Sequence, residues 1–353
     1  MNSLCCLLYC RPGFEKEAAS EIMQQSQLQG IQGYVKAKPD SAYICFYPTA
    51  ALPLDDFNAL IPFNQLIFAR QSLFVSEMIK NLPSDDRITP LLASIKATGL
   101  SFYDVLLETP DTNEGKQLSG FCKKFSTPLR IALEKHRLID TQSKWRLHLF
   151  FLSSAAVYIG ISHIENSAAH PMGITRLRFP SSAPSRSTLK LEEAFKTMLS
   201  TAEQEKYLRN GMTAVDLGAC PGGWTWQLVK RGIRVSAIDN GSMDRALMDT
   251  GLVREIKADG FKYTPEPAVD WLVCDMVERP THIARLISRW FTAGYCQYAA
   301  FNLKLPMKKR FDMVMTCKTA IEAELSTLNR PFQLRIKHLY HDREEVTCVI
   351  LLL

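Results

Sequence analysis

A glycine-rich turn is the part of the sequence most suited to chemistry. The run Asp216-Leu-Gly-Ala-Cys-Pro-Gly-Gly-Trp224 follows an apolar stretch that predicts a strand and precedes one that predicts a helix. Such a turn lets the backbone approach a nucleotide-like ligand at the carboxyl ends of parallel strands. The spacing G-x-x-x-G-G differs from the G-x-G-x-x-G of dinucleotide-binding proteins, and the Lys-Ser/Thr pair of a P-loop is missing. The turn therefore predicts a site for a nucleoside-like ligand without a phosphate-binding loop.

Carboxylates follow at the ends of the next predicted strands. Asp239, Asp259 and Asp275 are expected to end the second, third and fourth strands of this half. Asp239 can accept hydrogen bonds from both hydroxyls of a ribose, and the cationic sulfonium and amino groups of S-adenosylmethionine suit an acidic crevice. Each aspartate alone could cap a helix, but the set and the turn together favour this cofactor. The predicted cofactor-binding residues are Ser187, Cys220, Pro221, Gly222, Gly223, Asp239, Asp259 and Asp275.

The glycine-rich run resembles motif I of the RNA ribose 2′-O-methyltransferases related to the heat-shock large-subunit rRNA methyltransferase. That family uses a Lys-Asp-Lys-Glu tetrad. The resemblance implies the same catalytic tetrad here, at Lys190, Asp275, Lys304 and Glu345. Glu344 is a rival for the last place, and Glu345 is preferred because it directly precedes Val346, as in the family pattern.

The tetrad suits the attack of a ribose hydroxyl on an activated methyl group. The hydroxyl is a poor nucleophile, so the displacement needs a base and alignment. Lys304 is expected to be that base, once burial and the ammonium of Lys190 make its neutral form accessible. Asp275 and Glu345 would orient the amines while opposing this shift, so the sequence leaves the net direction of the pKa change open.

Two other functions fit parts of the pattern. An RNA cytosine carbon-5 methyltransferase has a similar motif I but needs a cysteine nucleophile. Cys274, expected inside a strand, and Cys317, on a predicted helix, do not stand in the usual contexts. A non-catalytic RNA-binding ribosome-assembly factor would be free to lose the tetrad, and all four residues are present. Both alternatives are therefore disfavoured.

An α/β fold must position these residues. Beyond the Pro- and Ser-rich stretch at 180–187, strand and helix patterns alternate, which predicts a Rossmann-like, mostly parallel sheet. The expected strands are 212–217, 233–239, 253–258, 269–275, 297–304, 333–340 and 345–353. Because so few residues join the last two strands, the last strand should be antiparallel.

The first half predicts two smaller α/β domains. A strand at 4–9, a helix and a strand at 42–47 fit a ferredoxin-like unit. The expected domains are ferredoxin-like at 1–57, THUMP-like and RNA-binding at 58–170, a linker at 171–187 and the methyltransferase domain at 188–353. The whole chain is similar to the bacterial family that 2′-O-methylates a cytidine in the peptidyl-transferase region of 23S rRNA. This similarity implies 23S rRNA or a large-subunit precursor as the partner.

Basic residues gather between Lys116 and Arg146. The segment has eight Lys or Arg residues and two acidic ones, with Phe121, Phe125 and Trp145 between them. Cations mixed with aromatic rings suit RNA, whose phosphates and unstacked bases would both find partners. A solvated helix face is the alternative. The predicted RNA-binding residues are Lys123, Lys124, Arg130, Lys135 and Arg137.

Composition bounds the remaining possibilities. A length of 353 residues with 46% hydrophobic and 22% charged residues is typical of a globular protein with two or more cores. The longest apolar stretch, at 149–161, is too short to span a bilayer. Ten scattered cysteines without a C-x-x-C pair disfavour a disulfide framework or a zinc ribbon. We therefore expect a cytoplasmic protein with neither a membrane nor a metal among its partners.

Overall fold

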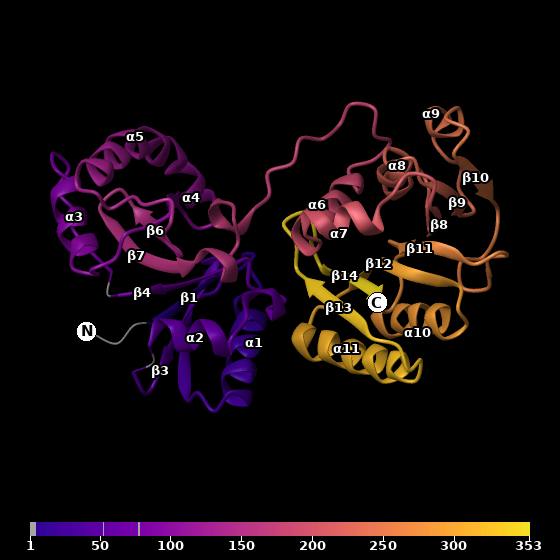
Figure 1. The fold of residues 1–353 in the computed structure, drawn as a ribbon, viewed down its shortest axis with the longest axis horizontal. Coiled ribbons are helices and arrows are strands. Elements are labelled where there is room, and N and C mark those ends of the chain that lie inside the picture. The colour runs from indigo at the N-terminus through magenta and orange to yellow at the C-terminus, as the bar shows by residue number, and fades with distance from the viewer. Residues whose placement is uncertain (1–4, 52, 77) are drawn as a thin grey trace. The chain divides into compact units, whose positions relative to one another are not determined.

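The computed structural model describes residues 5–51, 53–76 and 78–353. The chain divides into two compact units, Met1–Ile174 and Thr175–Leu353, and each has its own sheet (Figure 1). Both units combine helices with strands, which confirms the predicted α/β class. The finer boundaries at 57, 170 and 187 stay predictions.

The first unit opens with a βαββαβ order. Its strands lie in the order β2-β3-β1-β4 with every adjacent pair antiparallel, which is the predicted ferredoxin-like arrangement. Leu4, which begins the first predicted strand, lies outside the described residues. The elements are β1 (Cys5–Tyr9), α1 (Glu15–Leu28), β2 (Gly33–Ala37), β3 (Tyr43–Pro48), α2 (Leu54–Leu60) and β4 (Gln71–Val75), with a 3₁₀ turn η1 (Phe63–Gln65).

The same sheet continues through the rest of this unit. β7 pairs antiparallel with both β4 and β6, and β5 lies parallel to β6 at the edge. Phe102, Leu129 and Leu147 belong to the buried core beneath α5. The elements are α3 (Ile88–Lys96), β5 (Val105–Glu108), α4 (Asn113–Gln117), α5 (Ser119–Lys135), β6 (Trp145–Ser153) and β7 (Ala156–His163), followed by 3₁₀ turns η2 (Ile164–Asn166) and η3 (Pro171–Gly173).

The second unit has a seven-stranded sheet in the order β10-β9-β8-β11-β12-β14-β13. The first five strands are parallel, and β14 is antiparallel to both of its neighbours, as predicted. The strands are β8 (Thr213–Leu217), β9 (Arg234–Ile238), β10 (Val253–Ile256), β11 (Val269–Cys274), β12 (Cys296–Lys304), β13 (Phe332–Lys337) and β14 (Glu345–Leu352). The helices are α6 (Thr188–Met198), α7 (Thr201–Tyr207), α8 (Gly223–Val229), α9 (Arg245–Met248), α10 (Pro280–Thr292) and α11 (Arg310–Ser326).

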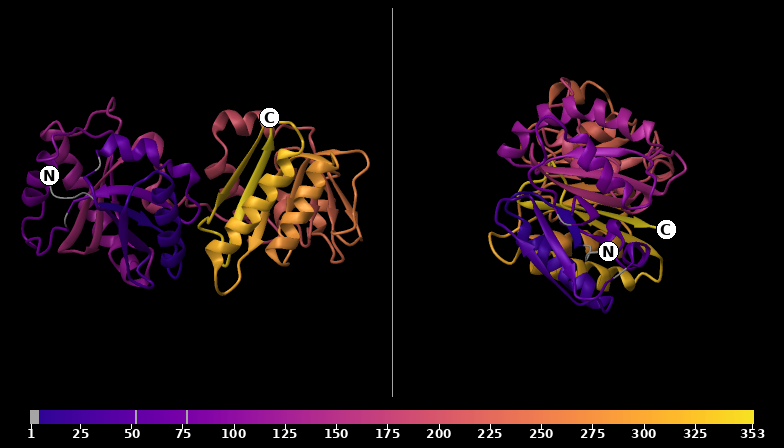
Figure 2. Two further views of the ribbon diagram at one scale, coloured as in Figure 1. Left: turned by 90° about the horizontal axis from the view of Figure 1, so that it is seen from below. Right: turned by 90° about the vertical axis from the view of Figure 1, so that its left-hand side faces the viewer.

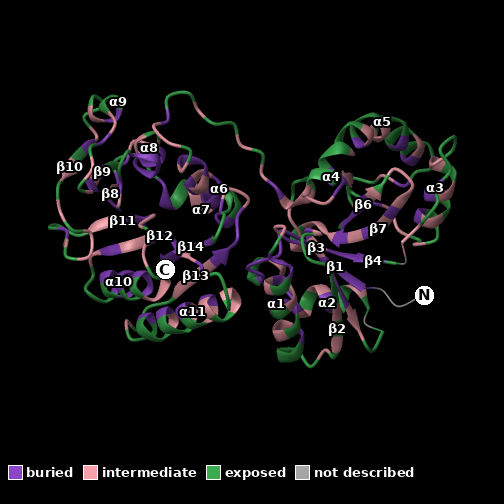
Figure 3. Cartoon of the chain, turned by 180° about the vertical axis from the view of Figure 1, so that it is seen from behind, coloured by how far each residue is buried: buried purple, intermediate pink, exposed green. Residues whose placement is uncertain are grey.

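Helices cover both faces of this second sheet. α6, α7 and α8 lie on one face, whereas α10 and α11 lie side by side on the other (Figures 1 and 2). In α10, Ile283, Leu286, Ile287 and Trp290 are buried at helical spacing, so its apolar stripe faces the sheet. β14 is buried along its whole length because the sheet is covered on both sides (Figure 3). None of the helices among the described residues combines the length and apolar character needed to cross a membrane.

Candidate active site

The glycine-rich turn lies where the strand order reverses. β8 has β9 on one side and β11 on the other, and ligands of open α/β sheets bind at such a switch point. Gly218 directly follows β8 and has a φ of +75°. A Cβ atom at Gly218 would lie 2.6 Å from Met276 Cγ, just beyond β11. The turn and the end of β11 are therefore in close contact.

The end of the turn packs against the start of α6. A Cβ atom at Gly223 would lie 2.1 Å from Ser187 Oγ, so the backbone at Gly223 closely approaches the Ser187 side chain. Gln227 Nε2 donates to Thr188 Oγ1 at 2.9 Å and thereby ties α8 to the first turn of α6. Ser187 and the glycines at 222 and 223, all predicted as cofactor-binding residues, thus come together in space.

The predicted aspartates differ in their positions. Asp239 directly follows β9, and its carboxylate accepts from the backbone N–H groups of Cys220, at 3.0 Å, and Gly241, at 2.7 Å. Asp259 does not end a strand as expected, because β10 stops at Ile256. The Asp259 carboxylate accepts from the N–H of Phe261 at 2.9 Å, in a local turn. Asp239 is therefore built into the glycine turn, whereas Asp259 lies farther along its own loop.

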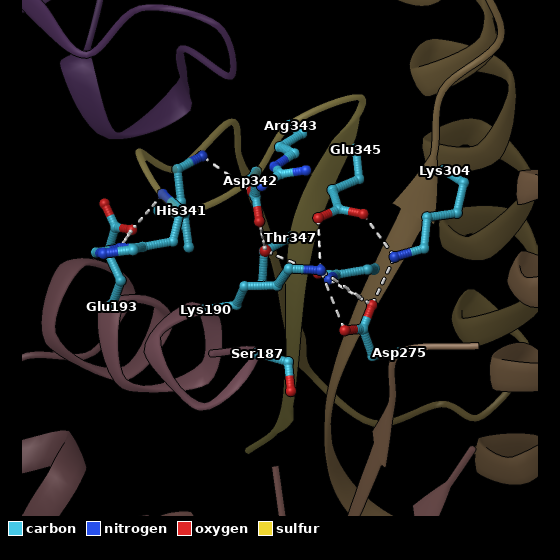
Figure 4. A network of polar contacts seen from close by, with 12 residues as sticks. Ser187, Lys190, Glu193, Asp275, Lys304, His341, Asp342, Arg343, Glu345 and Thr347 are labelled. Carbon is cyan, nitrogen blue, oxygen red and sulfur yellow. Dashed lines mark hydrogen bonds and ion pairs between the residues drawn. The ribbon is translucent and has the colours of Figure 1, made fainter. Parts of the chain in front are cut away.

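Four charged side chains meet beyond the ends of β11 and β12 (Figure 4). Lys304 Nζ lies 2.6 Å from Asp275 Oδ1 and 2.5 Å from Glu345 Oε2. Lys190 Nζ lies 3.1 Å from Asp275 Oδ2 and 2.6 Å from Glu345 Oε1. Lysines and carboxylates therefore alternate around a closed ring, which we call the tetrad. The Glu344 side chain is 60% exposed and pairs with an arginine instead, so Glu345 is the residue that contacts both lysines.

Secondary structure holds the tetrad from two sides. Lys304 and Glu345 are directly opposite each other in the antiparallel pair β12–β14. Lys190 lies in the first turn of α6, and Glu193 one turn later is buried. The Glu193 carboxylate accepts from both N–H groups of residues 340–341 at 2.9 Å, which fixes α6 against the loop before β14.

Burial and charge act against each other in the tetrad. Burial favours the neutral form of Asp275, but the ammonium groups of Lys304 and Lys190 outweigh it and lower the pKa of this carboxyl. Burial also disfavours the Lys304 ammonium, yet the carboxylates of Asp275 and Glu345 prevail and raise the pKa of Lys304 above its ordinary value. The sequence left the direction of the pKa shift of Lys304 open, and in the structure the pKa is raised.

A line of hydrogen bonds leads from Asp275 into the protein interior. Asn302 Nδ2 donates to Asp275 Oδ1 at 2.9 Å, so Asn302 Oδ1 accepts from Thr347 Oγ1 at 2.8 Å. The Thr347 hydroxyl also lies 2.9 and 3.0 Å from the two carboxylate oxygens of the buried Asp342. Burial raises the pKa of Asp342 well above its usual range, which agrees with a protonated carboxyl. Figure 4 shows Asp342 and Thr347 beside the tetrad.

Sequence reasoning missed Asn302, Thr347 and Asp342. A signal for two of them was present, because side chains on a strand alternate between faces. Asn302 stands two residues before Lys304 and Thr347 two residues after Glu345, so each shares a face with a tetrad member. The two strands also place Asn302 opposite Thr347.

The cysteines do not offer the nucleophile of a carbon-5 methyltransferase. Cys274 is buried in β11, and burial raises the pKa of its thiol to about 12. Cys317 is buried in α11, where burial raises the pKa to about 11. Neither thiol is ionised near neutral pH, and the thiolate is the reactive form. Cys220 is exposed, but it lies in the glycine turn, where its Sγ donates to the carbonyl of Ser242.

The predicted RNA-binding residues lie on α5 and just beyond its end. All five are exposed, namely Lys123, Lys124, Arg130, Lys135 and Arg137. Within the described part of the chain they take part in no ion pair. We call these five residues the α5 basic face.

The aromatic residues of this segment have another role than the expected stacking on bases. Phe121 and Phe125 stack on each other and meet the buried Phe151 edge-on, within the core of the first unit. Trp145 is buried. Arg146 is also buried and bound by Asp104 at 2.7 Å. The segment is therefore one exposed cationic face over a core, without an aromatic platform.

A methyltransferase that uses S-adenosylmethionine is the class that this fold and site define. No three His, Cys, Asp or Glu side chains in the described ranges cluster as metal ligands would. Residues 1–73 match the RlmM ferredoxin-like domain, residues 86–163 match the N-terminal part of Ribosomal RNA large subunit methyltransferase M, and residues 183–350 match the FtsJ-like methyltransferase family.

Similar proteins extend over nearly the whole chain. Ribosomal RNA large subunit methyltransferase M of Cellvibrio japonicus is 50% identical over 347 residues, which cover 98% of each chain. The protein of that name from Methylococcus capsulatus is 51% identical over 97% of this chain and 96% of its own. The one from Haemophilus influenzae (strain 86-028NP) is 46% identical over 100% of this chain and 99% of its own. This chain belongs to the Ribosomal RNA large subunit methyltransferase M family.

Proposed function

We propose that this protein transfers a methyl group from S-adenosylmethionine to the ribose 2′ oxygen of a cytidine in 23S rRNA, in the peptidyl-transferase region. The observation that carries the proposal is the tetrad, in which Lys304 Nζ lies within 2.6 Å of two carboxylates at the end of a parallel sheet. The relatives named above act on large-subunit RNA by name, and the similarity spans both units.

The residues at the switch point fit S-adenosylmethionine. Gly218 and Gly222 have positive φ, so the turn adopts a backbone conformation that other residues rarely take and that brings its backbone to the switch point of the sheet. Asp239 is only partly buried and can accept hydrogen bonds from ribose hydroxyls. Ser187, Cys220, Pro221, Gly223, Asp259 and Asp275 complete the proposed cofactor-binding set. When bound, S-adenosylmethionine supplies an electrophilic methyl group.

Lys304 acts on the substrate hydroxyl in this proposal. Its Nζ accepts the 2′ proton as the oxygen forms its bond to the methyl carbon and the carbon–sulfur bond breaks. The carboxylates of Asp275 and Glu345 fix the position of Lys304 Nζ. The Lys190 ammonium forms an ion pair with the other oxygen of each carboxylate. Because the carboxylates raise the pKa of Lys304, the lysine must first give up its own proton, which makes this deprotonation the costly part of catalysis.

The first unit is proposed to hold the RNA. The α5 basic face provides five exposed cations for phosphates, and such contacts position RNA without reading its bases. A naked 23S rRNA and a large-subunit precursor present the same phosphate chemistry. A cytoplasmic site of action agrees with this substrate and with ten free cysteines.

Labelled S-adenosylmethionine and protein-free 23S rRNA provide the test. Methylation should appear at one cytidine, and that position should resist alkaline cleavage, because cleavage there needs a free 2′ hydroxyl. Lys304→Ala should remove the product, whereas Lys318→Ala, on the surface of α11, should leave it unchanged. Label on a base carbon would instead support the carbon-5 alternative. An absence of transfer to naked RNA and to subunit precursors alike would support the non-catalytic factor.

A further inference from the structure

Among the described residues, the two most exposed large apolar side chains lie a few residues beyond the tetrad members Asp275 and Lys304. Met307 is 93% exposed and Val277 is 89% exposed, while the next in rank among the described residues, Leu28, is 71% exposed. Val277 lies in the loop after β11 and Met307 in the loop after β12. Apolar groups this exposed are costly to leave in water unless they serve contact with something else.

Chain connectivity keeps these side chains close to the reacting groups. Consecutive Cα atoms are 3.8 Å apart, so Val277 Cα lies within about 8 Å of Asp275 Cα and Met307 Cα within about 11 Å of Lys304 Cα. Asp275 and Lys304 themselves touch at 2.6 Å. The backbone of Val277 and of Met307 therefore lies near the tetrad, and we call this pair the apolar rim.

Unpaired cations accompany the apolar rim. Lys308 and Lys309 directly follow Met307, and Arg279 stands two residues beyond Val277; all three are exposed. They join no ion pair among the residues that the structure describes. A lipid or an apolar protein surface would not require this local excess of positive charge, whereas a nucleic acid offers phosphates for the cations and flat apolar bases for the rim.

We propose that Met307 and Val277 contact the bases of the two nucleotides that flank the target ribose, while Lys308 and Lys309 bind the adjacent phosphates. This inference rests on the proposed function. A 2′ hydroxyl in stacked RNA is hemmed in by the neighbouring nucleotides, and apolar side chains that insert between bases separate them. The apolar rim would hold the neighbours apart and so let the target ribose reach Lys304.

The test compares alanine variants on intact RNA and on RNA with an abasic nucleotide next to the target. Met307→Ala and Val277→Ala should each raise KM for the RNA by about 10-fold, the usual order for a lost contact with a base. The affinity for S-adenosylmethionine should not change. Met307→Leu should restore KM, and Leu28→Ala, an equally drastic change at an exposed apolar residue of α1, should have no effect.

An abasic nucleotide makes the contact itself visible. If Met307 meets a flanking base, then removing that base from the transcript should weaken binding to the wild type, and Met307→Ala should cost nothing further on that transcript. An unchanged KM in both alanine variants, or an equal loss on intact and abasic RNA, would overturn the proposal. Failure of the proposed function is distinct, because the wild type would then methylate no ribose at all.

Discussion

Two clusters of closely hydrogen-bonded polar side chains, one in each unit, differ in access. In the first unit, His148 Nδ1 lies 2.7 Å from Glu108 Oε2 and His148 Nε2 lies 2.8 Å from Ser162 Oγ. Tyr9 also donates to the Glu108 carboxylate at 2.7 Å. A serine, a histidine and an acid in this order are what a hydrolytic triad needs. Yet the side chains of His148 and Glu108 are 0% exposed, so no substrate can reach them.

The tetrad of the second unit is partly open. The side chains of Lys304 and Asp275 are 20% and 16% exposed, although each is closely paired. The polar groups of both clusters have hydrogen-bond partners within the protein. The presence of such partners therefore does not distinguish a structural cluster from a catalytic one. What separates the two clusters is whether a reacting atom can approach. We therefore propose that the first cluster stabilises its sheet and that the tetrad carries out the chemistry.

The largest effect should follow from removing the base of the tetrad. Lys304→Ala should lower the rate of methyl transfer by about 10²–10⁴-fold, the usual contribution of a general base. Cofactor affinity should survive, because Lys304 acts on the RNA hydroxyl in the proposed mechanism. Asp239→Ala should do the reverse and weaken cofactor binding first. Calorimetric titration of both variants with S-adenosylmethionine separates the two roles, and equal losses of affinity would show that the division is wrong.

A substitution in the buried cluster of the first unit should instead lower the free energy of unfolding. Glu108→Ala leaves Tyr9, His148 and the N–H of Met172 without their common acceptor, and each buried group left without a partner costs about 1–3 kcal/mol. Urea unfolding followed by signals from the first unit should show this loss. S-adenosylmethionine affinity should stay at the wild-type value. A Glu108→Ala protein of full stability would remove the contrast between the clusters.

Much of the fold could be predicted because local patterns encode it, whereas the tetrad was predicted from the resemblance to the RNA ribose 2′-O-methyltransferases. Alternating strands and helices fixed the parallel sheet, and Asp275, Lys304 and Glu345 stand at strand ends that apolar runs mark clearly. Asp259 was misplaced because the run at 253–258 continues in pattern after its pairing stops at Ile256. Phe121 and Phe125 looked accessible because the sequence does not reveal which side of α5 faces the core.

Interactions among residues distant in sequence could not be predicted in this way. The Glu108–His148 contact joins strands that are forty residues apart, and nothing local marks either residue as a partner. The pKa of Lys304 depends on the balance of burial against two carboxylates, and only distances decide it. Asp342 likewise reads as a turn residue until its burial is known.

The α5 basic face extends the comparison to a fully exposed set of charges. Replacing Lys123, Lys124 and Arg130 by alanine should weaken RNA binding at physiological salt by about 10-fold or more. It should also flatten the dependence of log affinity on log salt by about two units, since fewer cations leave the phosphates. Filter binding across a salt series measures both quantities, with Lys318→Ala as the control. An unchanged salt slope would count against this face as the RNA contact.

The pH dependence of methyl transfer should reveal the charge balance of the tetrad. A base works in its neutral form, and the raised pKa of Lys304 means that this form grows with pH throughout the neutral range. Single-turnover rates should therefore rise by up to 10-fold per pH unit and not level off below the ordinary lysine pKa of about 10.4. Glu345→Gln removes one carboxylate that raises the pKa, so its plateau should begin at lower pH. A wild-type plateau near pH 7 would contradict this account.

The smallest effect should come from the line of hydrogen bonds behind Asp275. Thr347→Val keeps the shape but removes the hydroxyl, so Asn302 Oδ1 and the carboxyl group of Asp342 both lose a partner. The unsatisfied groups should cost about 1–3 kcal/mol of stability. With Asn302 less firmly held, Asp275 should orient Lys304 less well, and kcat should fall a few-fold while KM for RNA and cofactor affinity stay constant. Thr347→Ser retains the hydroxyl and should restore kcat. If Thr347→Val lowered stability but left kcat unchanged, these hydrogen bonds would have only a structural role, like those of the buried cluster in the first unit.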